Sequence, residues 1–249
     1  MHLVFIRHGE PDYSVDSLTP EGFREADALA ARAAGWRGRV TACFCSPLGR
    51  AQATAKPSLA ALGMEAETLG WMAEFVIRTH DRPDGSRHCV TWDLLPAWRT
   101  AQPKLAEPEG WVGAEPYPAD HADEVVPRWE GVKAGVDGVL ARYGLVRDKG
   151  IYRAAPDAKR DATLVFFCHH GLACAAIAHL LGIAPPQLWD DFFLAPASVT
   201  VLNSEEREAG VVAFRCQCLG DTSHLRAAGL PVSRAGAFGD LFCEASFRR

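Results

Sequence analysis

The chain has 249 residues, of which 48% are hydrophobic and 23% are charged, and its formal net charge is −5. This is the composition of a globular protein, and its net negative charge offers no general field to attract nucleic acid or an anionic membrane, so any anion site must be local. The chain begins directly in a predicted strand, without the features of a signal peptide. We therefore expect a cytoplasmic protein that binds neither nucleic acid nor membrane.

The first sixty residues alternate between strand and helix patterns. Near-continuous apolar residues indicate strands covered on both faces, while Thr19 and Pro20 provide an N-cap and a first helical residue. Pro57 should kink or divide the second helix. This alternation predicts a parallel α/β sheet. The expected elements are a strand at 2–7, a helix at 18–36, a strand at 40–45 and a helix at 46–63.

Residues from about 75 to 120 lack clear periodicity and are rich in proline. A stretch of this length is usually a binding insertion or is disordered, and Trp92, Trp98 and Trp111 argue against simple disorder. We expect a single domain over 1–249 with a cap or insertion at about 75–120.

The remaining sequence returns to regular patterns. Gly144 and Gly182 should end its two helices, and residues 162–168 have the pattern of a central strand. The expected elements are a helix at 121–144, a polar connector at 147–161, a strand at 162–168, a buried helix at 171–182 and strands at 198–205 and 210–218.

Eight cysteines are present, with two C-x-C pairs and no C-x-x-C pair. In a cytosolic chain this pattern favours buried free thiols over a zinc site or disulfide bonds.

Polar residues follow three of the predicted strands. Arg7 and His8 follow the first strand, Arg50 lies four residues beyond Ser46 after the second, and His169 follows the strand at 162–168. In parallel sheets such positions meet at one edge, where ligands bind and helix N-termini favour anions. An arginine fork matches phosphate oxygens, and a neutral imidazole can attack phosphorus. These residues therefore predict a phosphate pocket with a histidine nucleophile.

The motifs that carry these residues resemble the histidine phosphatase, or phosphoglycerate mutase-like, superfamily. They cover the first sixty residues and roughly 160 to 226. The resemblance implies a three-layer α/β/α sandwich around a mainly parallel mixed sheet. The matching segments are Arg7-His8-Gly9-Glu10, Leu18 to Ala26, Ser46 to Thr54, Phe167-Cys168-His169 and, as an echo, Gly220 to Leu225.

The resemblance also implies roles for these side chains. His8 would become phosphohistidine, while Arg7, Arg50 and His169 would hold the phosphoryl oxygens and stabilise the charge that develops on them. This chemistry requires no metal and no cofactor. Relatives place the acid that protonates the leaving group shortly after the third strand, which selects Glu74 in this chain.

One acidic residue near the pocket is part of the match without being the acid, and one histidine departs from the family pattern. Glu10 lies close to the pocket, but in this family it is generally not the acid. Relatives usually carry glycine, serine or asparagine where this chain has His170. In relatives "HLLG" begins ten positions after the catalytic histidine, and His179 stands ten positions after His169. His169 is therefore the catalytic match. The backbone N–H of His170 would face phosphate, while its ring would add a donor or contact the substrate.

The expected function is a metal-independent phosphomonoesterase that acts on a small phosphorylated metabolite. The segment at 75–120 lacks the Tyr- and Lys-rich basic stretch of phosphoglycerate mutases, so mutase-type phosphoryl transfer is the alternative. A non-catalytic phosphate-binding or interaction module is a third interpretation, disfavoured because the catalytic set is complete. We expect the cap to select the leaving group, although its tryptophans are more often packing residues than substrate contacts. The sequence does not decide whether the protein forms a homodimer.

Overall fold

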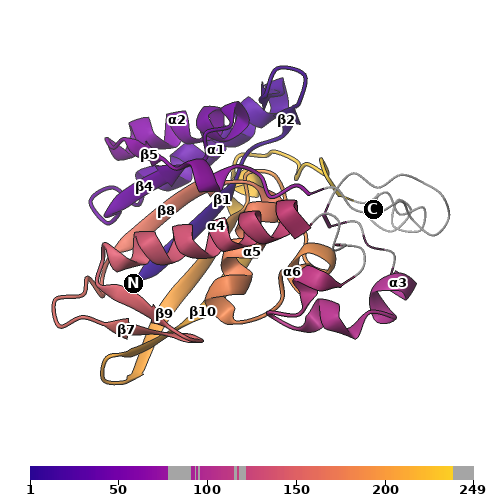
Figure 1. Cartoon of the computed structure of the whole chain (residues 1–249). Coiled ribbons are helices and arrows are strands. Elements are labelled where there is room, and N and C mark those ends of the chain that lie inside the picture. Colours follow the sequence, from indigo (N-terminus) through magenta and orange to yellow (C-terminus); the bar gives the residue numbers. More distant parts are fainter. Residues whose placement is uncertain (78–90, 93, 95, 115–116, 118–121, 238–249) are drawn as a thin grey trace.

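The computed structural model describes residues 1–77, 91–92, 94, 96–114, 117 and 122–237. Figure 1 shows a twisted sheet with helices on both faces. Its strand order is β5 (Ala66–Thr68), β4 (Ala42–Cys45), β8 (Thr163–Cys168), β1 (His2–Arg7), β9 (Val199–Glu208), β10 (Val211–Asp221), β7 (Ile151–Ala154) and β6 (Leu145–Asp148).

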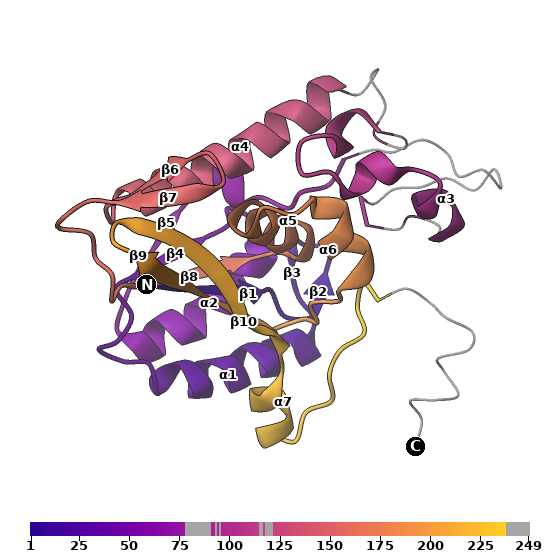
Figure 2. The same ribbon diagram turned by 90° about the horizontal axis from the view of Figure 1, so that it is seen from below.

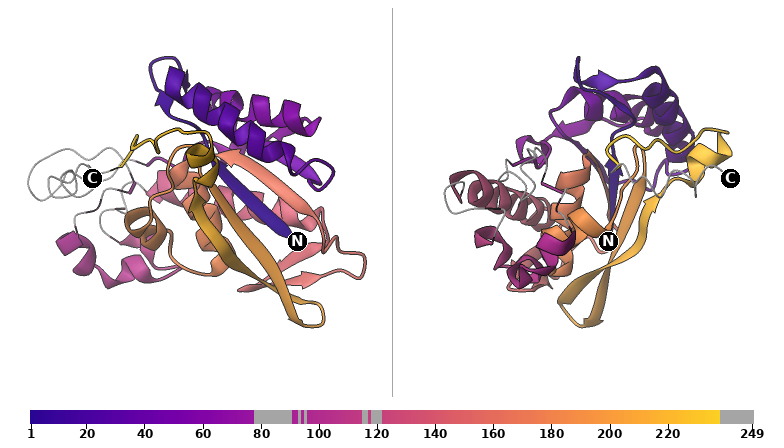
Figure 3. Two further views of the ribbon diagram at one scale, coloured as in Figure 1. Left: turned by 180° about the vertical axis from the view of Figure 1, so that it is seen from behind. Right: turned by 90° about the vertical axis from the view of Figure 1, so that its right-hand side faces the viewer.

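The sheet is mixed. Strands β5, β4, β8 and β1 run parallel, whereas β9, β10, β7 and β6 pair with their neighbours in antiparallel fashion. The long β9–β10 hairpin, coloured orange to yellow, extends along the sheet in Figure 3. A small pair, β2 (Pro11–Asp12) with β3 (Ser17–Leu18), lies in the connection after β1.

Helices cover both faces of the sheet, as Figure 2 shows. In β1, Val4 and Ile6 pack toward one cluster of buried residues, and Leu3 and Phe5 pack toward the other. This burial on both faces explains why β1 is nearly all apolar. One layer contains α1 (Pro20–Ala34) and α2 (Gly49–Leu62), and the other contains α4 (Ala122–Ala141), α5 (His170–Leu181) and α6 (Pro185–Asp191). The predicted three-layer α/β/α sandwich is confirmed.

The helix ends follow the predicted signals with one exception. The Thr19 hydroxyl accepts the Gly22 N–H at 3.0 Å and caps α1, and Gly182 ends α5 with a left-handed φ of 70°. By contrast, α2 begins at Gly49 and continues through Pro57 without a break. The short helix α7 (Ser223–Ala227) follows β10.

The predicted polar connector at 147–161 is wrong in its first half, because β6 and β7 form a hairpin there. Leu145 and Tyr152 are buried, and Tyr152 pairs with Val212 of β10. Lys149, with a φ of 56°, makes the turn. Each strand has only four residues, several of them charged and exposed, so the alternation is too short to show a strand period.

Short helices occupy the described parts of the predicted cap. Trp111 is fully buried, and its ring contacts those of Trp129 and Trp189 at 5.7 and 5.3 Å, so it belongs to the core. The side chain of Trp98 lies outside the described residues. The elements are η1 (Gly70–Met72), before the cap, and α3 (Pro96–Thr100), η2 (Pro103–Ala106) and η3 (Trp111–Gly113) within it.

Six cysteines fall in the described ranges and all are free thiols, four of them buried. Cys89 and Cys243 lie outside those ranges. No helix in the described part of the chain is both long and apolar enough to cross a membrane.

A buried carboxyl group on α1 supports the loop that follows β1. Glu25 is 0% exposed, and its Oε2 accepts the Glu10 N–H at 2.6 Å. Burial raises the pKa of Glu25 to about 7, and the nearby charge of Glu10 adds to this shift. Because the folded protein binds this proton more tightly than the unfolded chain, stability falls as pH rises from about 4.5 through about 7.

We expect Glu25→Gln to remove this pH dependence, because the amide oxygen can still accept the Glu10 N–H without a charge. Relative to the wild type, the variant should gain roughly 2–3 kcal/mol of unfolding free energy between mildly acidic and mildly basic pH. Urea unfolding across this range measures the gain. Asp27→Asn, which changes an exposed carboxyl on the same helix, is the control. Parallel stability curves for wild type and Glu25→Gln would contradict the prediction.

Candidate active site

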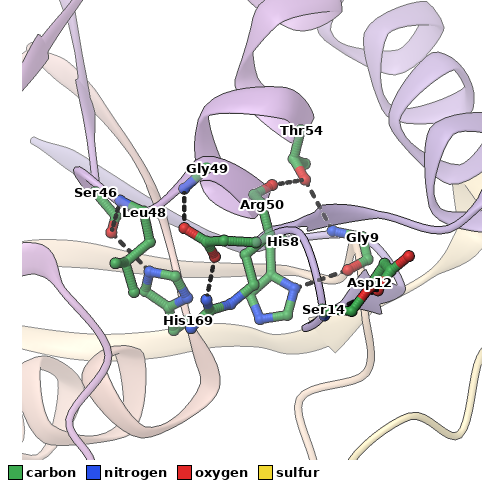
Figure 4. Close-up of polar contacts among 11 residues, drawn as sticks. His8, Gly9, Asp12, Ser14, Ser46, Leu48, Gly49, Arg50, Thr54 and His169 are labelled. Atoms are coloured by element: carbon green, nitrogen blue, oxygen red, sulfur yellow. Dashed lines mark hydrogen bonds and ion pairs between the residues drawn. The ribbon is translucent and has the colours of Figure 1, made fainter.

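The carboxyl ends of three neighbouring parallel strands bring the predicted site residues together. Strands β4, β8 and β1 are adjacent in the sheet, and backbone bonds continue past their ends. The His8 N–H donates to the Cys168 carbonyl and the Ser46 N–H to the Phe167 carbonyl, both at 2.9 Å. Figure 4 shows His8, Arg50, Ser46 and His169 converging at this edge.

The tautomer of His8 follows from its hydrogen bond. Its Nδ1 lies 2.7 Å from the Gly9 carbonyl oxygen, which can only accept, so Nδ1 carries the proton (Figure 4). Burial holds the pKa of His8 well below its usual value, and the charges of Arg7 and Arg50 lower it further. The ring is therefore neutral at physiological pH, and its Nε2 keeps a free lone pair.

Arg7 is a buried cation held by backbone carbonyls from two distant segments. It donates to the Leu194 carbonyl at 2.5 Å and to the Ala235 carbonyl at 3.0 Å. Burial lowers its pKa from the usual value, and the charge of Glu74 partly offsets this. Its Nε is buried and has no hydrogen-bond partner among the described residues. This nitrogen is left as a donor for an anion in the pocket.

Arg50, in the first turn of α2, is oriented by the β2–β3 connection. Its Nη1 lies 2.5 Å from Asp16 Oδ1, and the other oxygen of Asp16 accepts the Gly49 N–H at 2.7 Å. The exposed Tyr13 ring lies over the guanidinium at 5.4 Å. The Nε of Arg50 is also buried and unpaired in the described structure.

His169 forms a hydrogen bond with Ser46 that sequence reasoning did not single out. Its Nε2 lies 2.6 Å from Ser46 Oγ, and that oxygen also accepts the Leu48 N–H at 3.2 Å. Because the described structure offers the Ser46 proton no other acceptor, it goes to Nε2, and Nδ1 of His169 carries the ring proton. Nδ1 is buried without a partner there, and the His169 ring lies 5.2 Å from that of His8.

Glu74 is the half-buried carboxyl predicted as the acid. Its Oε1 accepts the Phe75 N–H at 2.8 Å and the Leu172 N–H, in the first turn of α5, at 3.0 Å. Burial raises its pKa, and these two bonds and the charges of Arg7 and Arg50 offset the shift only in part. Glu74 therefore holds a proton more readily than an exposed glutamate does.

His170 begins α5 and is buried. Its ring meets the edge of Trp92 at 5.2 Å and lies 6.3 Å from Phe193. Burial, with the charge of Arg7, lowers its pKa to about 3, so this ring adds no charge to the pocket.

Close backbone packing fixes the loop that carries His8. A Cβ at Gly9 would lie 2.7 Å from the Gly22 carbonyl oxygen, so a larger residue would displace the loop from α1. The Gly9 N–H donates to Thr54 Oγ1 at 2.9 Å, and that hydroxyl donates to the Arg50 carbonyl at 2.8 Å. The loop after β1 and the first turns of α2 therefore fix each other's position.

All six predicted residues lie at this one edge of the sheet. Ser46 and Thr54 were part of a recognised motif, so the signal for them was present, although no role was assigned. Asp16 and the carbonyls of Leu194 and Ala235 carried no sequence signal, because their contribution depends on how distant segments fold back. Within the described ranges, no cluster of three histidine, cysteine, aspartate or glutamate side chains could hold a metal ion.

Solved structures share this fold. A mycobacterial glucosyl-3-phosphoglycerate phosphatase, in complex with VO3, matches with 21% identity and a TM-score of 0.55 over 89% of this chain and 99% of its own. A phosphoserine phosphatase mutant from Entamoeba histolytica matches with 20% identity and a TM-score of 0.56, over 90% of this chain and 98% of its own. Among curated proteins, no sequence matches the chain.

The family model of the histidine phosphatase superfamily, branch 1, matches residues 3–217. This range includes the strand ends that carry Arg7, His8, Arg50 and His169, and it covers most of the chain. The chain belongs to the histidine phosphatase superfamily.

Proposed function

We propose that this protein is a metal-independent phosphomonoesterase that acts on a small phosphorylated metabolite through a phosphohistidine at His8. One observation carries the proposal: a neutral His8 with a free Nε2 stands among buried donors of Arg7, Arg50 and His169 that lack partners in the described structure. A phosphoryl group would supply the missing acceptors. The similarity to phosphatases supports hydrolysis, and a complete donor set argues against a purely structural role.

The donors are suited to the charge that builds up during phosphoryl transfer. The guanidinium groups of Arg7 and Arg50 are fixed by carbonyl and carboxylate partners, so they need little reorganisation to meet the transferring oxygens. The Nδ1–H of His169 adds a third donor next to His8. Preorganised donors of this kind act most strongly where water is excluded.

In the first step, His8 Nε2 attacks phosphorus, a P–N bond forms and the bond from phosphorus to the leaving oxygen breaks. Glu74 gives its proton to that oxygen, so the product leaves as a neutral alcohol. In the second step, the Glu74 carboxylate takes a proton from water as the water oxygen attacks phosphorus. The P–N bond breaks, phosphate leaves and His8 is again neutral.

Trapping the phosphorylated enzyme tests the chemistry. With EDTA present, rapid acid-free quenching of a reaction with a phosphomonoester should give base-stable, acid-labile phosphate on His8, located by mass spectrometry. His8→Ala should lose this label. Separately, hydrolysis measured over a panel of phosphomonoesters identifies the substrate. Activity lost with EDTA and restored by Mg²⁺ would contradict the metal-independent mechanism. Return of the label to a phosphoglycerate, in place of water, would make the protein a mutase.

The role of Glu74 predicts different effects on two steps. With an alkyl phosphate, Glu74→Gln should lower kcat/KM by about 10²–10⁴-fold, because the alkoxide then leaves without a proton. With p-nitrophenyl phosphate, whose leaving group needs no proton, the variant should retain an initial burst of nitrophenol while later turnover slows. Glu65→Gln, which changes an exposed carboxyl nearby in sequence, is the control. An equal loss of burst and turnover for both substrates would place the acid elsewhere.

A further inference from the structure

Three aromatic rings form a row beside the arginine that faces the phosphate pocket. Trp92 meets His170 at 5.2 Å, His170 lies 6.3 Å from Phe193, and the Phe193 ring lies 5.5 Å from the Cζ of Arg7. We call Trp92, His170 and Phe193 the aromatic row. Its three rings come from separate parts of the chain. Trp92 lies in the predicted cap, His170 begins α5 and Phe193 follows α6.

The outer end of the row is exposed but firmly anchored. Phe193 is 42% exposed, and the next residue, Leu194, accepts the Arg7 hydrogen bond at 2.5 Å through its carbonyl. This hydrogen bond ties the backbone beside Phe193 to Arg7 and so places Phe193 at the edge of the pocket. An apolar ring is thus held in solvent next to a cation that faces the site.

The inner end of the row lies beside the proposed acid. A Cβ on Gly171 would collide with the Trp92 ring and would lie 2.9 Å from Glu74 Oε1. The Trp92 ring and the Glu74 carboxyl therefore both border the space above Gly171. Trp189 donates to the Gly171 carbonyl at 2.8 Å and fixes this turn of α5.

The position of the aromatic row indicates which part of the substrate it would contact. The leaving oxygen must reach Glu74 while phosphorus stays between His8 and the arginines. The group attached to that oxygen therefore extends away from the phosphate donors and along the side of the pocket where Trp92, His170 and Phe193 stand. His170 is uncharged there, since its pKa is lowered to about 3.

We infer that the aromatic row binds the leaving group, and that favoured substrates are phosphomonoesters of an alcohol with an aromatic or other flat apolar face. Such a face can stack on Phe193 and Trp92, and offset or edge-to-face ring contacts are favourable beyond the apolar area that they bury. The inference rests on the proposed function, because it assigns the leaving-group side from the role of Glu74.

Phosphonates test the inference without any chemical step, so differences in leaving-group reactivity do not enter. Calorimetry should show that wild-type protein binds benzylphosphonate at least ~10-fold more tightly than 2-hydroxyethylphosphonate. This is the lower end of the range for gaining one apolar contact in a binding pocket. Phe193→Ala should lose most of this preference, and Phe193→Leu should keep part of it. Phe192→Ala is the matched control, since Phe192 is 44% exposed and makes no ring contact within the described structure.

Two binding results would overturn the inference. One is equal affinity of the wild type for both phosphonates. The other is an equal loss for both in Phe193→Ala, which would show that the ring only supports Arg7. Hydrolysis of benzyl phosphate and glycerol 1-phosphate is measured in parallel. A benzylphosphonate preference that Phe193→Ala removes, in a protein that hydrolyses neither these esters nor any other member of the phosphomonoester panel, would support the aromatic row and contradict the phosphatase proposal.

Discussion

The neutral, buried ring of His8 is the feature on which the pocket depends: burial disfavours its protonated form most, and the positive charges of Arg7 and Arg50 disfavour it further. Burial and the two guanidinium groups keep His8 unprotonated, while the Gly9 carbonyl fixes its proton on Nδ1. The cations themselves are only partly compensated, by two carbonyls for Arg7 and by Asp16 for Arg50. Under the proposed function, a bound phosphoryl dianion would offset the two positive charges and supply acceptors for the unpaired donors.

Most of the fold serves to hold these charges in place. The parallel order β4–β8–β1 brings Ser46, His169 and His8 to one edge, and the loops around them tie the side chains to backbone groups. Ser233 donates to Glu10 at 2.5 Å, and Ala235 accepts from Arg7, so the segment after α7 also closes on the site. Polar contacts therefore fix the side of the pocket that contains His8 and the two arginines, whereas the side beside Glu74 is bordered by aromatic rings.

Local signals were enough to predict the parallel strands, the capped helix α1 and the placement of Arg7, His8, Arg50 and His169 at strand ends, whereas the choice of Glu74 rested on the resemblance to the family. Continuous apolar runs indicate strands buried on both faces, and a strand end followed by Arg7 and His8 places them at the ligand-binding edge. The hairpin β6–β7 was missed because its strands are short and partly charged. Asp16 and the Leu194 carbonyl could not be found, since they meet the arginines only through long-range folding. The sequence left open whether Trp111 packs in the core or contacts the substrate, and its burial places it in the core.

The central claim is that His8 is neutral, with its proton on Nδ1 and a free Nε2. Nitrogen-15 NMR of the labelled protein, with the His8 signals assigned by comparison with His8→Ala, measures both nitrogens directly. Across the ordinary histidine pKa of 6.5 the spectra should show a protonated Nδ1 and an unprotonated Nε2, without titration, because burial and two cations oppose a second proton. A titration near the ordinary value of 6.5, or a proton on Nε2, would contradict the account.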